Sequence, residues 1–207
     1  MLIAMCIASA IFASIQQYLA YSWCIATPPA STGLTLKDMN IETIPSGSIL
    51  GIEKKGFIWF IVKFVQHLGG LQQWSKITHT GTALWVGNVL YSVEMDGSCN
   101  VLRQVAQHIN EGSVVNVYKS PVNLLIYLDA VTADSISYDY VDILLIGIRL
   151  LTGWDIVDKT PNEAVCSSFT ANWLLRCGWE PEQGFPTLPS PAEVIRELNL
   201  HSDAAIV

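Results

Sequence analysis

Charged side chains are scarce in this sequence, and basic ones are the scarcest. Asp, Glu, Lys and Arg make up 14% of the 207 residues, whereas an average soluble domain contains about 25%. The net charge is −7, and Lys and Arg form no cluster along the chain. Because a protein that tracks the phosphates of nucleic acid needs such a cluster, the composition argues against nucleic acid as a partner. The hydrophobic content of 51% instead predicts a folded domain with a sizeable core.

Several cysteine and serine motifs are also missing. The five cysteines include no CxxC pair, so neither a zinc site nor a complete disulfide framework is predicted. Cys166 and Cys177 share one helical pattern, in which eleven residues span roughly 16 Å, well beyond the Cα separation of about 7 Å that a disulfide allows. Free thiols are therefore expected at all five positions, most of them inert. No GxSxG elbow occurs, which argues against a serine hydrolase.

Charge is absent altogether from the start of the chain, up to Lys37. A signal peptide would need a basic region before its apolar core, and the apolar run stops at Gln16, short of the roughly 20 residues that span a bilayer. A membrane-associated segment, a cleaved signal and a helix that packs on a partner or an oligomer all stay open. The stretch TPPASTG is typical of a linker. We therefore expect a hydrophobic N-terminal helix and linker over 1–33 and one domain over 34–207.

The rest of the sequence combines strand and helix patterns. Strands are predicted within 44–52 and 113–120, and a hairpin within 76–97. Helices are predicted at the following places: 56–70, twice within 122–154, around Cys166, and at the end of 185–198. The stretch 56–70 is too short to span a bilayer, so it is expected to be buried or interfacial. This order predicts an α+β fold with a small antiparallel sheet packed against helices.

The hairpin places a histidine and a carboxylate on one face. A two-residue turn at Gly87-Asn88 pairs Val86 with Val89, and alternation of the side chains then puts His79 and Glu94 on the same side. Glu94 is diagonal to His79, within reach of a long side chain. A carboxylate at an imidazole nitrogen fixes the tautomer and stabilises the imidazolium, as a general base requires. The alternative is a structural histidine that a nearby acid satisfies.

The position of Cys166 in its helix depends on where that helix begins. A capping box starting at Thr160, with Glu163 at its third helical position, would put Cys166 in the second turn. A start near Val165 would put it in the first turn, where the helix dipole and free N–H groups lower a thiol pKa. Sequence does not separate the two starts. Cys177, late in the same pattern, is expected to be plain core.

Together these residues form the parts of a thiol hydrolase: Cys166 at a helix start, His79 on a strand, and Glu94 on the neighbouring strand. The other histidines fit this role less well, because His67 ends an apolar helix and His108 lies in the polar stretch QHINEGS. His201 is close to the C-terminus.

The order of several short motifs resembles the circularly permuted branch of the NlpC-type papain-like superfamily, typified by YiiX-like proteins, with the lecithin:retinol acyltransferase group as a more distant relative. The motifs are SGSIL, SKITHTGTAL, LYSVEMDG, ISYDYVDIL, AVCSSFTANWLLRCGW and LPSPAEV, within residues 44–196. The resemblance implies a papain-like core with Cys166 as nucleophile, His79 as base and Glu94 as the third polar residue. Tyr138 and Tyr140 match an aromatic-rich region of such proteins, and Ser48 stands where an acidic residue is usual.

The resemblance implies a cysteine peptidase or amidase that cleaves a cell-wall peptide of peptidoglycan through a thioester, with no metal or organic cofactor. A lipid acyl hydrolase or acyltransferase at a membrane is the alternative, favoured by the apolar stretches 57–68 and 141–151, whose other interpretation is core packing. A non-catalytic structural or virion component that retains the fold is a third. Residues 1–30 are expected to contact a membrane or an oligomer. The protein would then be associated with a membrane, exported, or part of a virion.

Overall fold

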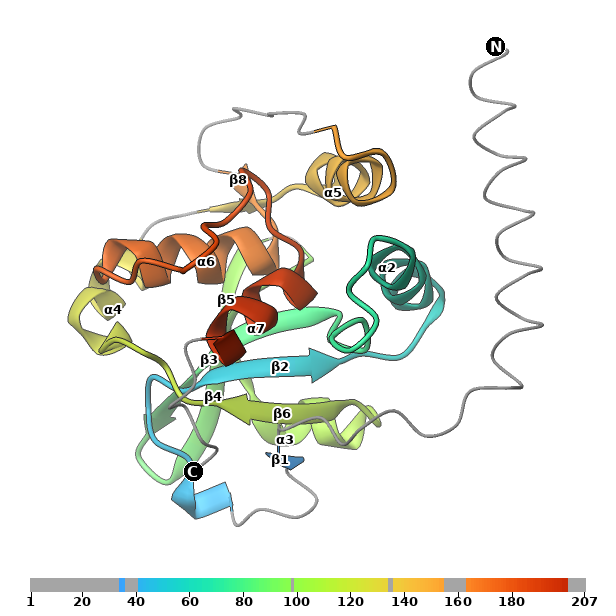
Figure 1. The fold of residues 1–207 in the computed structure, drawn as a ribbon. Helices are drawn as coiled ribbons and strands as arrows, with labels where there is room; N and C mark the ends of the chain where they lie inside the picture. Colours follow the sequence, from blue (N-terminus) through green and yellow to red (C-terminus); the bar gives the residue numbers. More distant parts are fainter. Residues whose placement is uncertain (1–33, 36–40, 98, 134–135, 155–162, 201–207) are drawn as a thin grey trace. The chain divides into compact units, whose positions relative to one another are not determined.

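The computed structural model describes residues 34–35, 41–97, 99–133, 136–154 and 163–200 (Figure 1). The predicted N-terminal helix therefore lies outside the described residues. The strands are β1 (Leu34–Thr35), β2 (Ile49–Glu53), β3 (His79–Val86), β4 (Val89–Asp96), β5 (Cys99–Gln104), β6 (Val114–Tyr118), β7 (Ser137–Tyr138) and β8 (Glu163–Ala164). The helices are η1 (Ile41–Thr43), α2 (Phe57–Leu68), α3 (Val105–Asn110), η2 (Leu124–Tyr127), α4 (Leu128–Ala133), α5 (Tyr140–Thr152), α6 (Cys166–Arg176) and α7 (Pro191–Leu200). The chain is α+β, as predicted.

The strands form one sheet in the order β1-β6-β2-β3-β4-β5-β7-β8. Every neighbouring pair is antiparallel except β7 and β8. The β3–β4 hairpin has the predicted register, because its ladder runs from Val86–Val89 to Thr82–Val93 around the Gly87-Asn88 turn. Gly87 has a φ of 59°, as a two-residue hairpin turn requires.

Helices cover both faces of the sheet. On one face α6 packs across β3 and β4, and Trp173, Leu174 and Ile195 join sheet residues in the main hydrophobic core. On the other face α3 contributes Val105 to a second cluster with Leu50 and other residues of the sheet. The Cys166 helix is therefore held directly against the hairpin that carries the histidine and the carboxylate.

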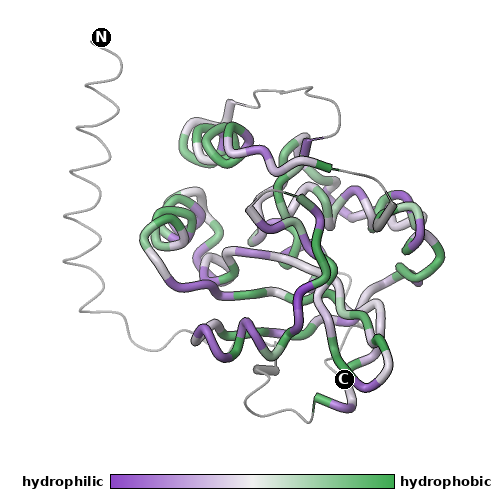
Figure 2. Tube along the Cα trace, turned by 180° about the vertical axis from the view of Figure 1, so that it is seen from behind, coloured by the Kyte–Doolittle hydropathy of each residue, from purple (hydrophilic) through white to green (hydrophobic). Residues whose placement is uncertain are grey.

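Helices α2 and α5 pack on each other at one end of the domain (Figures 1 and 2). Gly69, which ends α2, lies so close to α5 that a Cβ atom there would be 2.9 Å from Cβ of Leu150. Helix α2 confirms the helix predicted within 56–70, and α5 confirms the second helix of 122–154. No helix in the described part of the chain is both long and apolar enough to cross a membrane.

Besides four short elements (β1, η1, β7 and β8), a longer strand and a helix had no counterpart in the sequence prediction. Strand β5 and helix α3 lie between the hairpin and the strand predicted at 113–120, within a stretch that is mixed in polarity and lacks a clear period. Every residue of β5 is half-buried except Leu102, which is exposed. The strand therefore lacks the alternation of buried and exposed residues that identifies a strand in a sequence. This omission matters, because α3 carries His108.

Candidate active site

Cys166 is the first residue of α6, and Val165 is its N-cap. The start near Val165 is thus correct and the capping box starting at Thr160 is wrong, because Glu163 belongs to strand β8. Ser168 defines this start: its Oγ accepts a hydrogen bond from the backbone N–H of Val165 at 3.0 Å and donates to the Val165 carbonyl at 3.1 Å. The first turn of a helix has backbone N–H groups without a helical partner, and these lie beside the Cys166 side chain.

His79 and Glu94 come together as the hairpin predicts. His79 opens β3, Glu94 lies in β4, and Nε2 of His79 is 3.4 Å from Oε2 of Glu94. Both side chains are completely buried, and Cys166 is 3% exposed. The two atoms are close enough for an ion pair, but their contact does not have the geometry of a hydrogen bond. All three residues predicted for the site therefore belong to one buried cluster.

The thiol and the imidazole shift each other's pKa. Burial by itself raises the pKa of Cys166, but the charge of His79 and a backbone hydrogen bond from Thr80 outweigh burial, so the pKa lies below the ordinary thiol value. Burial also acts to lower the pKa of His79, whereas the charges of Cys166 and Glu94 raise it to about 9. Opposite shifts of this kind favour a thiolate beside an imidazolium at neutral pH.

Two threonines tie the start of α6 to the histidine strand. The carbonyl oxygen of Cys166 accepts hydrogen bonds from the hydroxyls of Thr80 and Thr170, each at 3.0 Å, and the two hydroxyls are 3.1 Å apart. Thr80 follows His79 directly in β3. The backbone of the candidate nucleophile is thereby fixed relative to the candidate base, which preorganises the pair.

A fourth side chain, His108 of α3, completes the cluster, and sequence reasoning missed it. Its Nε2 lies 3.0 Å from Oε2 of Glu94, and Oγ of Ser92 donates to the same oxygen at 2.8 Å. His79 and His108 acting on the Glu94 carboxylate keep its pKa well below the usual range, although burial by itself would raise it. Because a carboxylate only accepts hydrogen bonds, Nε2 of His108 carries the proton that it shares with Glu94.

Gly81 makes room for this arrangement. A Cβ atom at position 81 would lie 2.1 Å from Oγ of Ser92 and 3.2 Å from Cβ of Glu94. Real Cβ atoms do not approach other atoms so closely, so any larger residue would displace Ser92, Glu94 or the strand. The absence of a side chain at position 81 is therefore part of what allows a hydroxyl and a carboxylate to occupy this face of the hairpin.

Aromatic residues from α2, from β7 and from the start of α5 border the cluster. Trp59 meets the His79 ring edge to face at 6.0 Å, and the Lys54 ammonium lies 5.1 Å from the centre of the Trp59 ring. Tyr138 and Tyr140 have ring centres 5.0 Å apart. Burial, with a smaller contribution from Cys166, raises the pKa of Tyr138 far above that of a free phenol. Tyr138 pairs with Ala164, two residues before Cys166, and so lies on the thiol side of the cluster, whereas Trp59 lies beside the imidazole.

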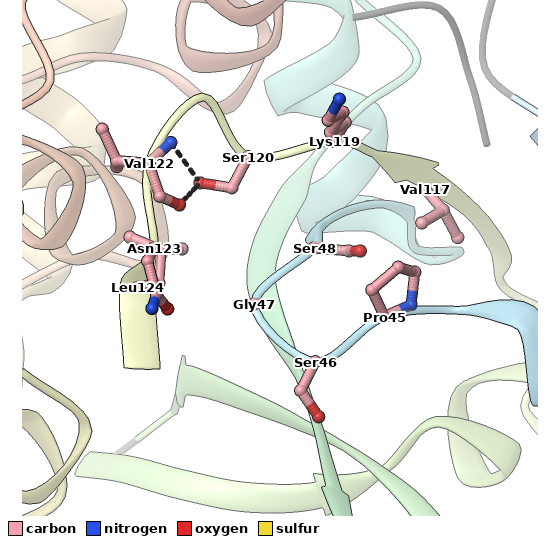
Figure 3. A pocket seen from close by; sticks show the side chains of 10 residues that line it. All are labelled: Pro45, Ser46, Gly47, Ser48, Val117, Lys119, Ser120, Val122, Asn123 and Leu124. Carbon is pink, nitrogen blue, oxygen red and sulfur yellow. Dashed lines mark hydrogen bonds between the residues drawn. The ribbon is translucent and has the colours of Figure 1, made fainter. Parts of the chain in front are cut away.

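The motif SGSIL lies at a different place in the fold. Ser48 is buried and helps to line a cavity of about 210 Å³ between the turn 45–48 and the segment 117–124 (Figure 3). Ser120 bridges to Val122 at the opposite wall, through bonds to its N–H and carbonyl. Neither Cys166 nor His79 lines this cavity. Both residues are buried, so neighbouring side chains separate them from solvent.

The remaining candidates lie elsewhere. Cys177 follows α6, is half-buried against the main core as expected, and has a pKa raised by burial. Cys99, Cys166 and Cys177 are all free thiols, as predicted. His67 lies near the end of α2, whereas Cys6, Cys24 and His201 fall outside the described residues. No protein-family model matches this chain, and no curated protein matches it either.

Proposed function

We propose that this chain is a cysteine hydrolase that transfers an acyl group through a thioester, with Cys166 as nucleophile, His79 as general base and acid, and Glu94 as the residue that orients His79. The observation that carries the proposal is the buried Cys166–His79–Glu94 cluster, in which the thiol pKa is lowered and the imidazole pKa is raised. A purely structural buried cysteine would have a raised pKa. The order of the motifs supports a permuted papain-like fold of the NlpC type.

The mechanism follows from these positions. The Cys166 thiolate attacks the carbonyl carbon of an amide or ester, and the tetrahedral oxyanion is stabilised by backbone N–H groups at the start of α6. His79 gives its proton to the leaving nitrogen or oxygen, and the acyl group remains on sulfur as a thioester. His79 then takes a proton from water, which attacks the thioester and releases the acid and the thiolate. Glu94 stabilises the imidazolium throughout.

Two substrate classes fit this chemistry. The resemblance to NlpC-type proteins favours peptide amides of the bacterial cell wall. The exposed apolar surfaces of α2 and α5 favour acyl groups of lipids as the second candidate, because each helix buries one side and leaves large apolar residues exposed on another. Phe57 is 78% exposed and Leu144 is 64% exposed.

Parallel assays on peptidoglycan fragments and on lipid esters test the proposal. Wild-type protein should hydrolyse one class, and Cys166→Ala should abolish that hydrolysis without changing the fold. Cys177→Ala is the matched control at the other end of the same helix: it should retain activity and lose only about 1 kcal/mol of stability. Hydrolysis that persists in Cys166→Ala would overturn the assignment of the nucleophile, and a protein whose Cys166 is inert would fit the non-catalytic structural role.

A further inference from the structure

Helices α2 and α5 expose an apolar stripe each. On α2 the exposed large residues are Phe57, Ile58, Phe60, Ile61 and Leu68. On α5 and directly after it they are Tyr140, Val141, Leu144, Leu151 and Trp154. Most recur at intervals of three, four or seven positions, so each set follows one side of its helix. We name these ten residues the α2–α5 apolar surface.

The ionised groups of the two helices do not contribute to this surface. Lys63 of α2 pairs with Glu53. Arg149 of α5 forms an ion pair with Glu193 at 2.8 Å, and Asp142 is buried. The charged side chains Lys63, Asp142 and Arg149 are thus paired or buried, whereas large apolar residues of the same helices are exposed, the reverse of a surface helix in a water-soluble protein. Figure 2 shows both helices as mostly hydrophobic and side by side.

We propose that the α2–α5 apolar surface docks on the face of a lipid bilayer with neutral headgroups. A contiguous exposed apolar surface marks an interaction site, and three observations identify the occupant. The surface contains no charge, so it offers no ion pairs to a protein partner. Tyr140 begins α5 and Trp154 lies just beyond its end, both are exposed, and both residue types favour the membrane–water interface. The chain also begins with an uncharged apolar segment that ends before Lys37.

Charge selects the kind of headgroup. Neither helix presents an exposed cation, and the whole chain has a net charge of −7. Anionic lipids attract clusters of Lys and Arg, which are absent here, and they would repel the acidic domain. Burial of apolar side chains at the level of the headgroups is therefore the driving force, and zwitterionic phosphatidylcholine is the appropriate probe.

The docking surface is connected to the candidate active site. Trp59 of α2 contacts His79. Tyr140, at the first turn of α5, contacts Tyr138, which pairs with Ala164 two residues before Cys166. A docked bilayer would therefore approach the helix that contacts His79 and the helix that contacts Tyr138, and the substrates favoured are acyl groups presented at a membrane. This last consequence rests on the proposed hydrolase function, whereas the docking itself does not.

Hydroxyl-radical footprinting of the full chain, read by peptide mass spectrometry, tests the docking directly, because it reports the exposure of individual aromatic side chains. Phe57, Tyr140 and Trp154 should be oxidised rapidly in lipid-free protein and several-fold more slowly with phosphatidylcholine vesicles. Tyr127 is exposed on η2 and serves as the internal control, whose oxidation should not change. The double variant Ile61→Glu with Leu144→Glu should abolish the protection, whereas Leu102→Glu on β5 should retain it.

Each alternative occupant has its own signature in this experiment. Slow oxidation of the surface in lipid-free protein at every protein concentration would show that residues 1–33 cover it, and would overturn the proposal. If the surface residues of lipid-free protein are oxidised slowly only at high protein concentration, a second copy of the chain covers the surface, and this result would also overturn the proposal. The binding of the protein to the same vesicles is measured separately by flotation in a density gradient. If the protein binds but Phe57, Tyr140 and Trp154 are still oxidised rapidly, another segment binds the membrane, and the proposal is overturned. None of these readouts depends on activity, so failure of docking and failure of catalysis are distinguishable.

Discussion

Nε2 of His108 lies 3.0 Å from the same oxygen of Glu94 that faces Nε2 of His79 at 3.4 Å. The carboxylate thus sits between two buried imidazoles, one directed toward the thiol side and one on the opposite side of the cluster. His108 does not reach the reacting atoms in this arrangement. Its contribution is to hold Glu94, so it is a positioning residue.

Replacement of His108 tests this role. His108→Ala removes one donor from a buried carboxylate, which costs about 1–3 kcal/mol, and should move the pH profile of Cys166 alkylation to higher pH. His108→Gln supplies an amide donor and should restore most of the wild-type profile. A merely structural histidine would lower the melting temperature in both variants and leave the pH profile of each unchanged.

Alkylation of the thiols by iodoacetamide should separate the two cysteines of the α6 region. The pKa of Cys166 is lowered by His79, while that of Cys177 is raised by burial. Cys166 should therefore begin to react at a lower pH than Cys177, and His79→Ala should abolish this difference. Peptide mass spectrometry across a pH series measures both rates in one sample. Equal rates for Cys166 and Cys177 in wild-type protein would contradict the activated pair.

The titration of His79 should depend on its two negative partners. Its pKa is raised to about 9 against the opposing effect of burial, so the ring should stay protonated through neutral pH and lose its proton only as the pH rises through about 9. Removal of the thiol in Cys166→Ala should lower the midpoint, as should Glu94→Gln. Nitrogen chemical shifts of the imidazole measure all three titrations. A midpoint near 6.5 in wild-type protein would refute the ion pair.

Gly81→Ala should destabilise the protein by about 1–3 kcal/mol, the usual cost of overpacking, because the new methyl group would overlap Oγ of Ser92. Removal of that hydroxyl in the double variant with Ser92→Ala should recover part of the loss, a coupling that a double-mutant cycle in urea measures.

Gly147→Ala is the control, since Cβ there would meet only Val65 at an ordinary 3.9 Å. In the middle of α5 it should be neutral or stabilising, by up to about 1 kcal/mol. Strictly additive effects of Gly81→Ala and Ser92→Ala would show that the strand relieves the overlap in another way.

Local sequence patterns determined those features of the fold that depend on residues close together in the chain. The alternation around Gly87-Asn88 set the hairpin register, and with it the approach of His79 to Glu94, since side chains on a strand point to alternate faces. The apolar period of α6 and the small hydroxyl residues after Cys166 placed a helix there. They left two possible starts, because the choice depends on whether Glu163 pairs with β7 or caps a helix.

Tertiary structure decided what no local period encodes. His108 reaches Glu94 only because β5 turns back along β4 and α3 then packs on the sheet, so its role depends on a path through an element with no clear pattern. The exposure of α2 and α5 is equally non-local. The apolar pattern of such a helix is compatible both with burial in a core and with a place on the surface. Only the packing of each helix on its neighbours determines which of its sides remains open to solvent or to a membrane.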